Sequence, residues 1–359
     1  MDLSQTYSPF RSVLLREWRR MTSRRLYFGV CIVLPLFTLF FMATIFGNGQ
    51  MENIPIGIID QDNTATSRAI TRNISAVPTF KVVKHYVNEA AAREAVQKKE
   101  IYGYLSIPPR FEQNAITGKN ATLSYYYHYA LLSVGGELMA AFETSLAPVS
   151  LSPIIMEAVS LGADQQQITT FLLPVQANNH PIYNPSLDYS VYLSQPFFFV
   201  LFQVLILLTT VYTVGIEIKF RTATDWLATA KGNMITAVLG KLLPYTFIYI
   251  LIGWLGNYVM FGILHIPFQG SWWLINMITV LFVIATQALG LFIFSLFPAV
   301  SLVISVVSMV GSLGATLSGV TFPVSNMYPL VRDASYLFPV RHFTEMIQTM
   351  LYGGGGFIY

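Results

Sequence analysis

The ninety residues from Leu242 to Val331 contain no Asp, Glu, Lys or Arg. A helix needs about 20 consecutive apolar residues to cross the hydrocarbon core of a bilayer. A soluble core could not bury a run of ninety such residues, whereas a membrane accommodates it as several spans. Only 11% of the 359 residues are charged, against about 25% in an average soluble domain. The sequence therefore predicts an integral membrane protein.

A short polar segment, 217–241, lies between the uncharged runs 191–216 and 242–264, and we call it the elbow. It contains two acidic residues and four basic ones. Cytoplasmic loops carry an excess of lysine and arginine. We therefore expect the elbow on the cytoplasmic side, where a partner in the cytosol would push on the membrane-embedded helices.

Residues 1–25 contain six arginines, and their apolar residues recur at helical spacing. This pattern predicts an amphipathic helix on the inner membrane face, with its arginines toward the headgroups. A signal peptide is excluded because the basic region is long and the apolar run after it has full span length, with no small-residue cleavage site. The residues of the expected apolar face are Phe10, Val13, Leu14, Trp18 and Met21.

The segment 47–190 has the composition of an ordinary soluble domain. Strand-like runs alternate with helix-like runs, which predicts one small α/β domain. With the N-terminus in the cytoplasm, this domain is expected to be extracytoplasmic. The expected strands are 54–59, 80–87, 101–107 and 122–129, and the expected helices are 66–74, 89–99 and one that opens at 133 and continues toward 171.

The predicted fold class is an α-helical multi-pass membrane protein with an inserted α/β extracytoplasmic domain. The expected order is a cytoplasmic amphipathic helix (1–25), a first span (26–46), the extracytoplasmic domain (47–190), a second span (191–216), the elbow (217–241), a third span (242–264), a fourth (272–297), a fifth (299–320) and outer-face helices (321–359).

Signals for nucleotide or metal binding are absent from the sequence. No GxxxxGK[ST] loop occurs, so the chain has no recognisable nucleotide-binding loop of its own. The five histidines are scattered, and the single cysteine, Cys31, lies in an apolar run. Asp60-x-Asp62 fails the calcium-loop pattern because Thr64 and Ala65 follow, which favours a turn at a strand end. The small net charge of +3 indicates no nucleic-acid partner.

Three segments, taken in order, resemble the permease subunits of ABC-2 type ATP-binding-cassette exporters, of the multidrug-efflux kind. Residues 56–70 (IGIIDQDNTATSRAI) resemble the first outer strand and its Asp-rich turn, residues 217–227 resemble the cytoplasmic elbow, and residues 322–343 resemble the outer signature before the last span. The likeness in span order covers the whole chain. The chain departs from the family at Arg221, where glycine is usual, and in showing five spans instead of six, so we expect a sixth span to be missing.

The resemblance implies a transport subunit that is not itself an enzyme and holds no cofactor. ATP and magnesium would bind to a separate ABC ATPase subunit, and a second permease chain, identical or different, would complete the pair. Membrane lipid and a periplasmic adaptor protein are further expected partners, and the bacterial inner membrane is the expected location. The residues expected to contact and couple to the ATPase are Glu217, Arg221, Thr222, Asp225 and Trp226.

Four amides, Gln203, Asn257, Asn276 and Gln287, lie within the expected spans, where polar groups are costly unless they are paired. They either hydrogen-bond between helices or line a transport path. Because the block 242–331 offers no fixed charge, we expect amphipathic or apolar cargo, such as drugs or lipid-like molecules. Two alternatives stay open: an ATP-independent carrier or channel, and a membrane sensor with an extracytoplasmic ligand-binding domain.

Overall fold

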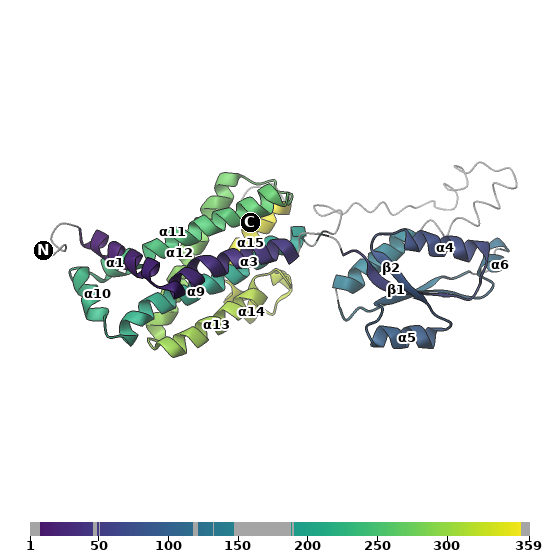
Figure 1. Cartoon of the computed structure of the whole chain (residues 1–359), viewed down its shortest axis with the longest axis horizontal. Coiled ribbons are helices and arrows are strands. Elements are labelled where there is room, and N and C mark those ends of the chain that lie inside the picture. The colour runs from purple at the N-terminus through teal and green to yellow at the C-terminus, as the bar shows by residue number, and fades with distance from the viewer. Residues whose placement is uncertain are drawn as a thin grey trace. The chain divides into compact units, whose positions relative to one another are not determined.

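The computed structural model describes residues 8–45, 49, 51–117, 121–131, 133–146, 188 and 190–352. It divides into two compact units (Figure 1). The helical unit comprises residues 1–49 and 181–359, and the α/β unit comprises residues 50–180.

Five helices among the described residues are long and apolar enough to cross a membrane, which confirms the expected number of apolar spans. Short π-helical turns interrupt or extend three of them. The spans are Arg25–Ile45 (α2 Arg25–Phe28, η2 Gly29–Val33 and α3 Leu34–Ile45), Ser190–Lys219 (η3 Ser190–Ser194 and α9 Gln195–Lys219), Met234–Ile263 (α11 Met234–Asn257 and η4 Tyr258–Ile263), Trp272–Leu296 (α12) and Val300–Leu317 (α13).

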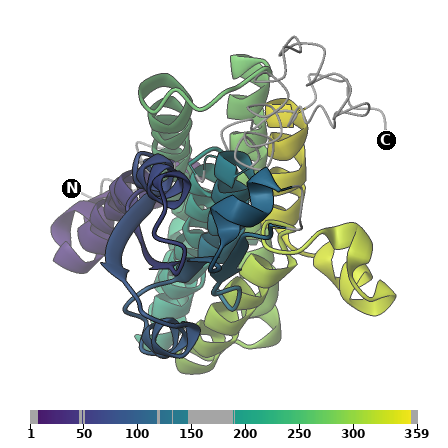
Figure 2. The ribbon, with the colours of Figure 1, turned by 90° about the vertical axis from the view of Figure 1, so that its right-hand side faces the viewer.

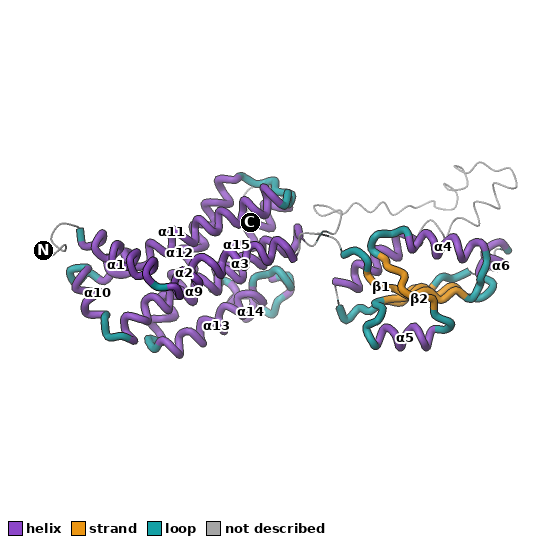
Figure 3. The backbone as a smooth tube through the Cα atoms, in the orientation of Figure 1, coloured by secondary structure: helices purple, strands orange, loops and turns teal. Residues whose placement is uncertain are grey.

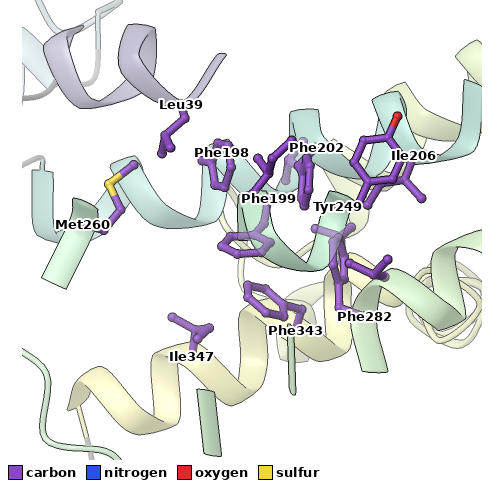
Figure 4. Packing of buried hydrophobic residues seen from close by; sticks show 14 of the residues in the cluster. Leu39, Phe198, Phe199, Phe202, Ile206, Tyr249, Met260, Phe282, Phe343 and Ile347 are labelled. Atoms are coloured by element: carbon purple, nitrogen blue, oxygen red, sulfur yellow. The ribbon is translucent and has the colours of Figure 1, made fainter. Parts of the chain in front are cut away.

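Helix α9 lies at the centre of the helical unit. In the most apolar stretch of the span that contains α9, 67% of the residues are buried by the rest of the chain, against 22% in α13. Its neighbours are α3, α11, α12, α13 and the C-terminal α15 (Pro339–Tyr352). Figure 4 shows Phe199 of α9 beside Phe343 of α15 and Phe282 of α12, with ring centroids 4.0 and 5.5 Å from that of Phe199. Helix α15 is thus part of the core of this unit.

The helices extend further into the elbow than the charge pattern indicates. Helix α9 ends at Lys219, a short helix α10 spans Ala223–Thr229, and α11 begins at Met234. The irregular part of the elbow is therefore confined to the residues on either side of α10.

Helix α1 (Pro9–Ser23) packs on α11 and α10, and Figure 1 shows α1 and α10 at the same end of the helical unit. Its buried face consists of Val13, Glu17 and Met21, whereas Trp18 is exposed. The expected apolar face therefore requires correction, because the side that meets the protein includes an acidic residue. A helix can bury a carboxylate only where the neighbouring helices supply partners for it.

After α13 the chain forms η5 (Val324–Asn326), α14 (Pro329–Ser335) and then α15. Figure 2 shows α14 projecting from the side of the helical unit while α15 lies among the spans. Tyr328, Leu330 and Leu337, in and around α14, are more than 70% exposed. The expected absence of a sixth span stays a prediction, and residues 353–359 lie outside the described residues.

The α/β unit is a four-stranded sheet with helices on both faces, and Figure 3 shows α4 and α5 on opposite sides of the strands. The strand order is β2-β1-β3-β4; β1 is parallel to β2 and β3, and β4 is antiparallel to β3. The elements in chain order are β1 (Ile54–Asp60), α4 (Ala65–Ser75), β2 (Phe80–His85), α5 (Glu89–Gln97), β3 (Gly103–Ile107), α6 (Phe111–Ile116), β4 (Ser124–Tyr127) and a helix at 133–146.

Successive side chains of β1 point to opposite faces of the sheet, and they divide the core of this unit into two layers. Ile56 and Ile58 are in one buried cluster with Ile74 of α4, and Ile59 is in another with Ala92 of α5. Helix α6 was not expected from the sequence, since it is a single short helix. The expected continuation of the last helix toward 171 falls outside the described residues.

The carboxylate of Asp60 closes the turn after β1. Its Oδ1 accepts hydrogen bonds from the backbone N–H groups of Asp62 and Asn63, both at 3.0 Å, and its Oδ2 accepts one from Ser67 at 2.7 Å. Asp60 therefore serves as the strand-end turn residue that the sequence favours.

Candidate functional site

Three fully buried charged residues, one each from α1, α9 and α11, meet where the two ends of the elbow come together. Glu17, Glu217 and Lys241 are at most 1% exposed. The Lys241 ammonium donates to Glu17 Oε2 at 2.7 Å and to Glu217 Oε1 at 2.8 Å. One lysine therefore joins the N-terminal helix to the helices on both sides of the elbow.

Two arginines of α1 complete this set of ions. Arg16 donates to Glu217 Oε2 at 3.1 Å, and Arg20 donates to Glu217 Oε1 and lies 3.7 Å from Glu17. These two were expected to face lipid headgroups with the other arginines, and their pairing with Glu217 corrects that expectation. We call Arg16, Glu17, Arg20, Glu217 and Lys241 the ion cluster.

Two neutral hydroxyl groups also donate hydrogen bonds to these carboxylates. Tyr245 on α11 donates to Glu17 Oε1 at 2.8 Å, and Thr222 donates to Glu217 Oε2. Burial opposes the charge of Arg20, but its hydrogen bond to Glu217 and the nearby charge of Glu17 outweigh this effect and raise the pKa of Arg20 above its ordinary value. Both carboxylates are thus fully paired, which buried ions require because desolvation costs several kcal/mol per ion.

A glycine permits the close contact on which the ion cluster depends. A Cβ atom added at Gly240 would lie 3.0 Å from the Val13 Cβ and 3.3 Å from the Phe10 carbonyl oxygen. Any larger residue would push α1 away from α11. Gly240 directly precedes Lys241, so the same turn of α11 provides both the close approach and the central cation.

The residues expected to couple to an ATPase divide into an interior and an exterior group. Glu217 is fully buried, and Trp226 is 5% exposed, with its Nε1 donating to the Ala237 carbonyl at 3.2 Å. Arg221 and Asp225 are exposed. Glu217 is therefore no solvated boundary charge, and only the exterior pair presents side chains to a partner.

Three apolar residues that flank the exterior pair in the sequence are also exposed. Phe220 is 58% exposed, and Met234 and Ile235 at the start of α11 are 59% and 71% exposed. Exposed apolar groups rimmed by charged residues are typical of interaction sites. We call Phe220, Arg221, Asp225, Met234 and Ile235 the elbow surface.

The four amides proposed to line a path take part in hydrogen bonds within the helical unit. Gln203 accepts from the Val340 N–H at 2.9 Å, and Gln287 accepts from the Thr246 hydroxyl at 2.7 Å. Asn257 donates to Asn276 at 3.3 Å and to Thr279 at 3.0 Å. Each of the four thus makes at least one hydrogen bond between helices, but Gln203 Nε2, Gln287 Nε2 and Asn257 Oδ1 have no partner among the described residues, so path lining stays a prediction.

An apolar cavity of about 270 Å³ lies between the first span, α9 and α13. Leu26, Val30, Leu205, Thr209 and Ile304 are among its lining residues. Leu26 of this lining belongs to α2, which directly follows α1 in the sequence, and α1 carries three residues of the ion cluster. Such a cavity can hold an apolar group.

The sequence did not single out Glu17 or Lys241 as functional residues. A signal for Glu17 does exist: it lies four residues after Val13 and four before Met21, and so shares their helical face. An acidic residue on an apolar stripe needs a buried cation. Nothing local identifies Lys241 as that cation, because it is 224 residues away.

Comparisons with known proteins agree with this architecture. A family model described as "ABC-2 family transporter protein" matches residues 25–358. The chain is similar to "Probable multidrug ABC transporter permease YbhS" of Escherichia coli (strain K12), with 29% identity over 121 residues, and equally to the protein of that name in Escherichia coli O157:H7. The match covers 33% of this chain and spans about a third (31%) of the length of these relatives. No solved structure matches.

Proposed function

Because the chain belongs to the ABC-2 family of transporter proteins, we propose that it is the permease subunit of an ATP-driven exporter. Two permease chains, identical or different, would pair, and separate ABC ATPase subunits would dock at the elbow. ATP and magnesium would bind to the ATPase, and this chain would supply the path through the membrane.

The observation that carries the proposal is the ion cluster behind the elbow surface. A force applied to Arg221 and Asp225 acts on α10 and the start of α11. The Lys241 ammonium, 2.7 and 2.8 Å from its two carboxylates, ties α11 to α1 and α9. Breaking these buried, hydrogen-bonded ion pairs would cost free energy. Because α9 is the most buried span, motion at the elbow would therefore be transmitted through the ions to the centre of the helical unit.

The proposed orientation follows from the basic residues at the elbow and in α1. It places both in the cytoplasm of a bacterial cell, and the α/β unit on the outer side of the inner membrane. There the α/β unit would be available to a periplasmic adaptor protein.

The proposed cargo is amphipathic or apolar. The cavity between the first span, α9 and α13 is lined mainly by aliphatic side chains, together with Cys31, Thr209 and two tyrosines. The block 242–331 contains no Asp, Glu, Lys or Arg. A strongly charged solute would find no fixed counter-ion there. The relatives named above are described as probable multidrug permeases, which is compatible with such cargo.

Charge reversal at the elbow surface tests the proposal. Asp225→Lys changes an exposed residue and leaves the ion cluster intact, whereas Glu217→Lys would add a buried cation beside three others and disturb the fold itself. We expect Asp225→Lys to lower the amount of ATPase that co-purifies with the detergent-solubilised chain several-fold, and to lower ATP-dependent transport of an apolar dye in vesicles.

A matched control is Glu94→Lys, which reverses a 63% exposed charge in the α/β unit and should change neither measurement. Unchanged co-purification and transport for Asp225→Lys would remove the elbow surface from the mechanism. Transport by wild-type chain in vesicles that contain no ATPase would favour the alternative of an ATP-independent carrier.

A further inference from the structure

A second cavity, of about 340 Å³, lies at the end of the helical unit opposite the elbow. It is lined by Tyr192, at the start of the second span, by Val320, just after α13, and by Arg341, Glu345 and Gln348 of α15. The second span begins at Ser190 and reaches the elbow at Lys219. The cavity is therefore one full span length from the ion cluster, at the depth of the headgroups of the other leaflet.

Arg341 is an incompletely paired buried ion. It is 4% exposed, and its Nε and Nη1 have no hydrogen-bond partner among the described residues. Its guanidinium carbon lies 3.8 Å from the centroid of the Tyr336 ring. The nearest carboxylate oxygen, on Glu345, is 3.8 Å from Nη2, and the Glu345 side chain is 65% exposed. This separation is too long for a hydrogen bond.

The contrast with the ion cluster shows what the cavity lacks. Lys241 and Arg16 each have a carboxylate oxygen within 3.1 Å, whereas Arg341 has none among the described residues. A guanidinium remains protonated in proteins, and a buried charge without a hydrogen-bonded partner is strongly unfavourable. An anion in the cavity would remove this cost.

We propose that the cavity beside Arg341 binds the phosphate headgroup of a membrane amphiphile. The fork of guanidinium N–H groups matches two oxygens of a phosphate, and the volume lies within the usual range for ligand pockets, which begins at about 300 Å³. A tail attached to the headgroup would lie in the surrounding bilayer. Glu345 weakens binding of the anion by repulsion and leaves the cavity accessible because its side chain points largely into solvent.

This site is independent of the proposed ATPase coupling, so it can be tested on the purified full-length chain alone. The chain is kept in a neutral maltoside detergent, and its thermal unfolding is followed with added dodecyl phosphate, inorganic phosphate or dodecanol. A ligand that binds the folded state raises the midpoint with concentration. We expect dodecyl phosphate to raise it and dodecanol to leave it unchanged. An equal rise with dodecanol would overturn the proposal.

The two phosphate probes distinguish the source of the anion. A rise with dodecyl phosphate but not with inorganic phosphate supports an amphiphile headgroup. An equal rise with inorganic phosphate at the same concentration would overturn the assignment to an amphiphile and identify a site for free phosphate.

Three variants locate the site. Arg341→Gln should weaken dodecyl phosphate binding about tenfold or more, because it removes a charge-assisted hydrogen bond. Arg332→Gln, which changes an exposed arginine of α14, should bind as wild type does. Glu345→Gln leaves Arg341 in place and should tighten binding. Glu345→Gln also keeps the proposal testable if Arg341→Gln fails to fold: equal or weaker binding by Glu345→Gln would overturn it.

Discussion

Replacing Lys241 by methionine removes the ammonium that joins α1, α9 and α11 while keeping a side chain of similar length. Glu217 retains Arg16 at 3.1 Å and Arg20, whereas Glu17 retains, within the described part of the chain, only the Tyr245 hydroxyl at 2.8 Å and Arg20 at 3.7 Å. Glu17 therefore becomes a buried carboxylate without a close cation. Breaking a buried pair in this way costs about 3–5 kcal/mol.

The loss should appear first at α1, because Glu17 holds this helix on α11. We expect backbone amides of α1 to exchange hydrogen faster in Lys241→Met, while amides in the centre of α9 are much less affected. Unfolding of the full-length chain in maltoside detergent should show a destabilisation of the size given above. Both measurements need only the permease chain.

A double variant separates the electrostatic cause from a loss of packing. Glu17→Gln in the Lys241→Met background removes the unpaired carboxylate and returns the cluster to its original net charge of +1, since one acid and one base have been neutralised. We expect it to recover about 0.5–3 kcal/mol, the usual size of coupling between contacting residues. The reasoning is refuted if Lys241→Met costs less than about 1 kcal/mol, or if the double variant is less stable than the single one.

Three further outcomes follow from the structure. Gly240→Val should cost about 1–3 kcal/mol and release α1 without altering any charge, which proteolysis near Ser23 can detect. Gln203→Leu should cost about 1–3 kcal/mol because the buried N–H of Val340 loses its acceptor; hydrogen exchange of α15 should rise, and unchanged exchange would show that the N–H has another partner. Burial raises the pKa of Glu137 in the folded state, so protonation of this carboxyl favours folding. The stability that this residue contributes is complete at pH values below its pKa in the unfolded chain. It is lost as the pH rises through its pKa in the folded chain. Glu137→Gln should therefore protect the helix at 133–146 from exchange better than wild type at pH 7 and equally well at pH 4.

The number of spans could be predicted from the sequence because burial in a bilayer is a local property. Each run of uncharged residues between 191 and 320 must satisfy its own backbone as a helix, whatever its neighbours are. The strands of the α/β unit could be predicted for a similar reason, since Ile54, Ile56 and Ile58 occupy every second position and so share one face of a strand.

The arrangement of the elbow could be predicted only in part from the sequence. Charge composition identified Glu217 and Asp225 in the same short segment, but it could not tell that one is buried and the other exposed. The helices on both sides extend into the segment, so that Glu217 and Lys241 belong to helices and face each other across 24 residues of sequence.

The sequence alone determined that this chain is a multi-pass membrane protein, because the cost of placing charge in hydrocarbon acts on each segment separately. Only the tertiary structure decided which charges are buried together: Glu17 meets Lys241 across 224 residues of sequence, and Arg341 enters the interior without a close anion from any residue that the structure describes. Coulomb attraction depends on distance in space, and the packing of α1, α9, α11 and α15 sets that distance.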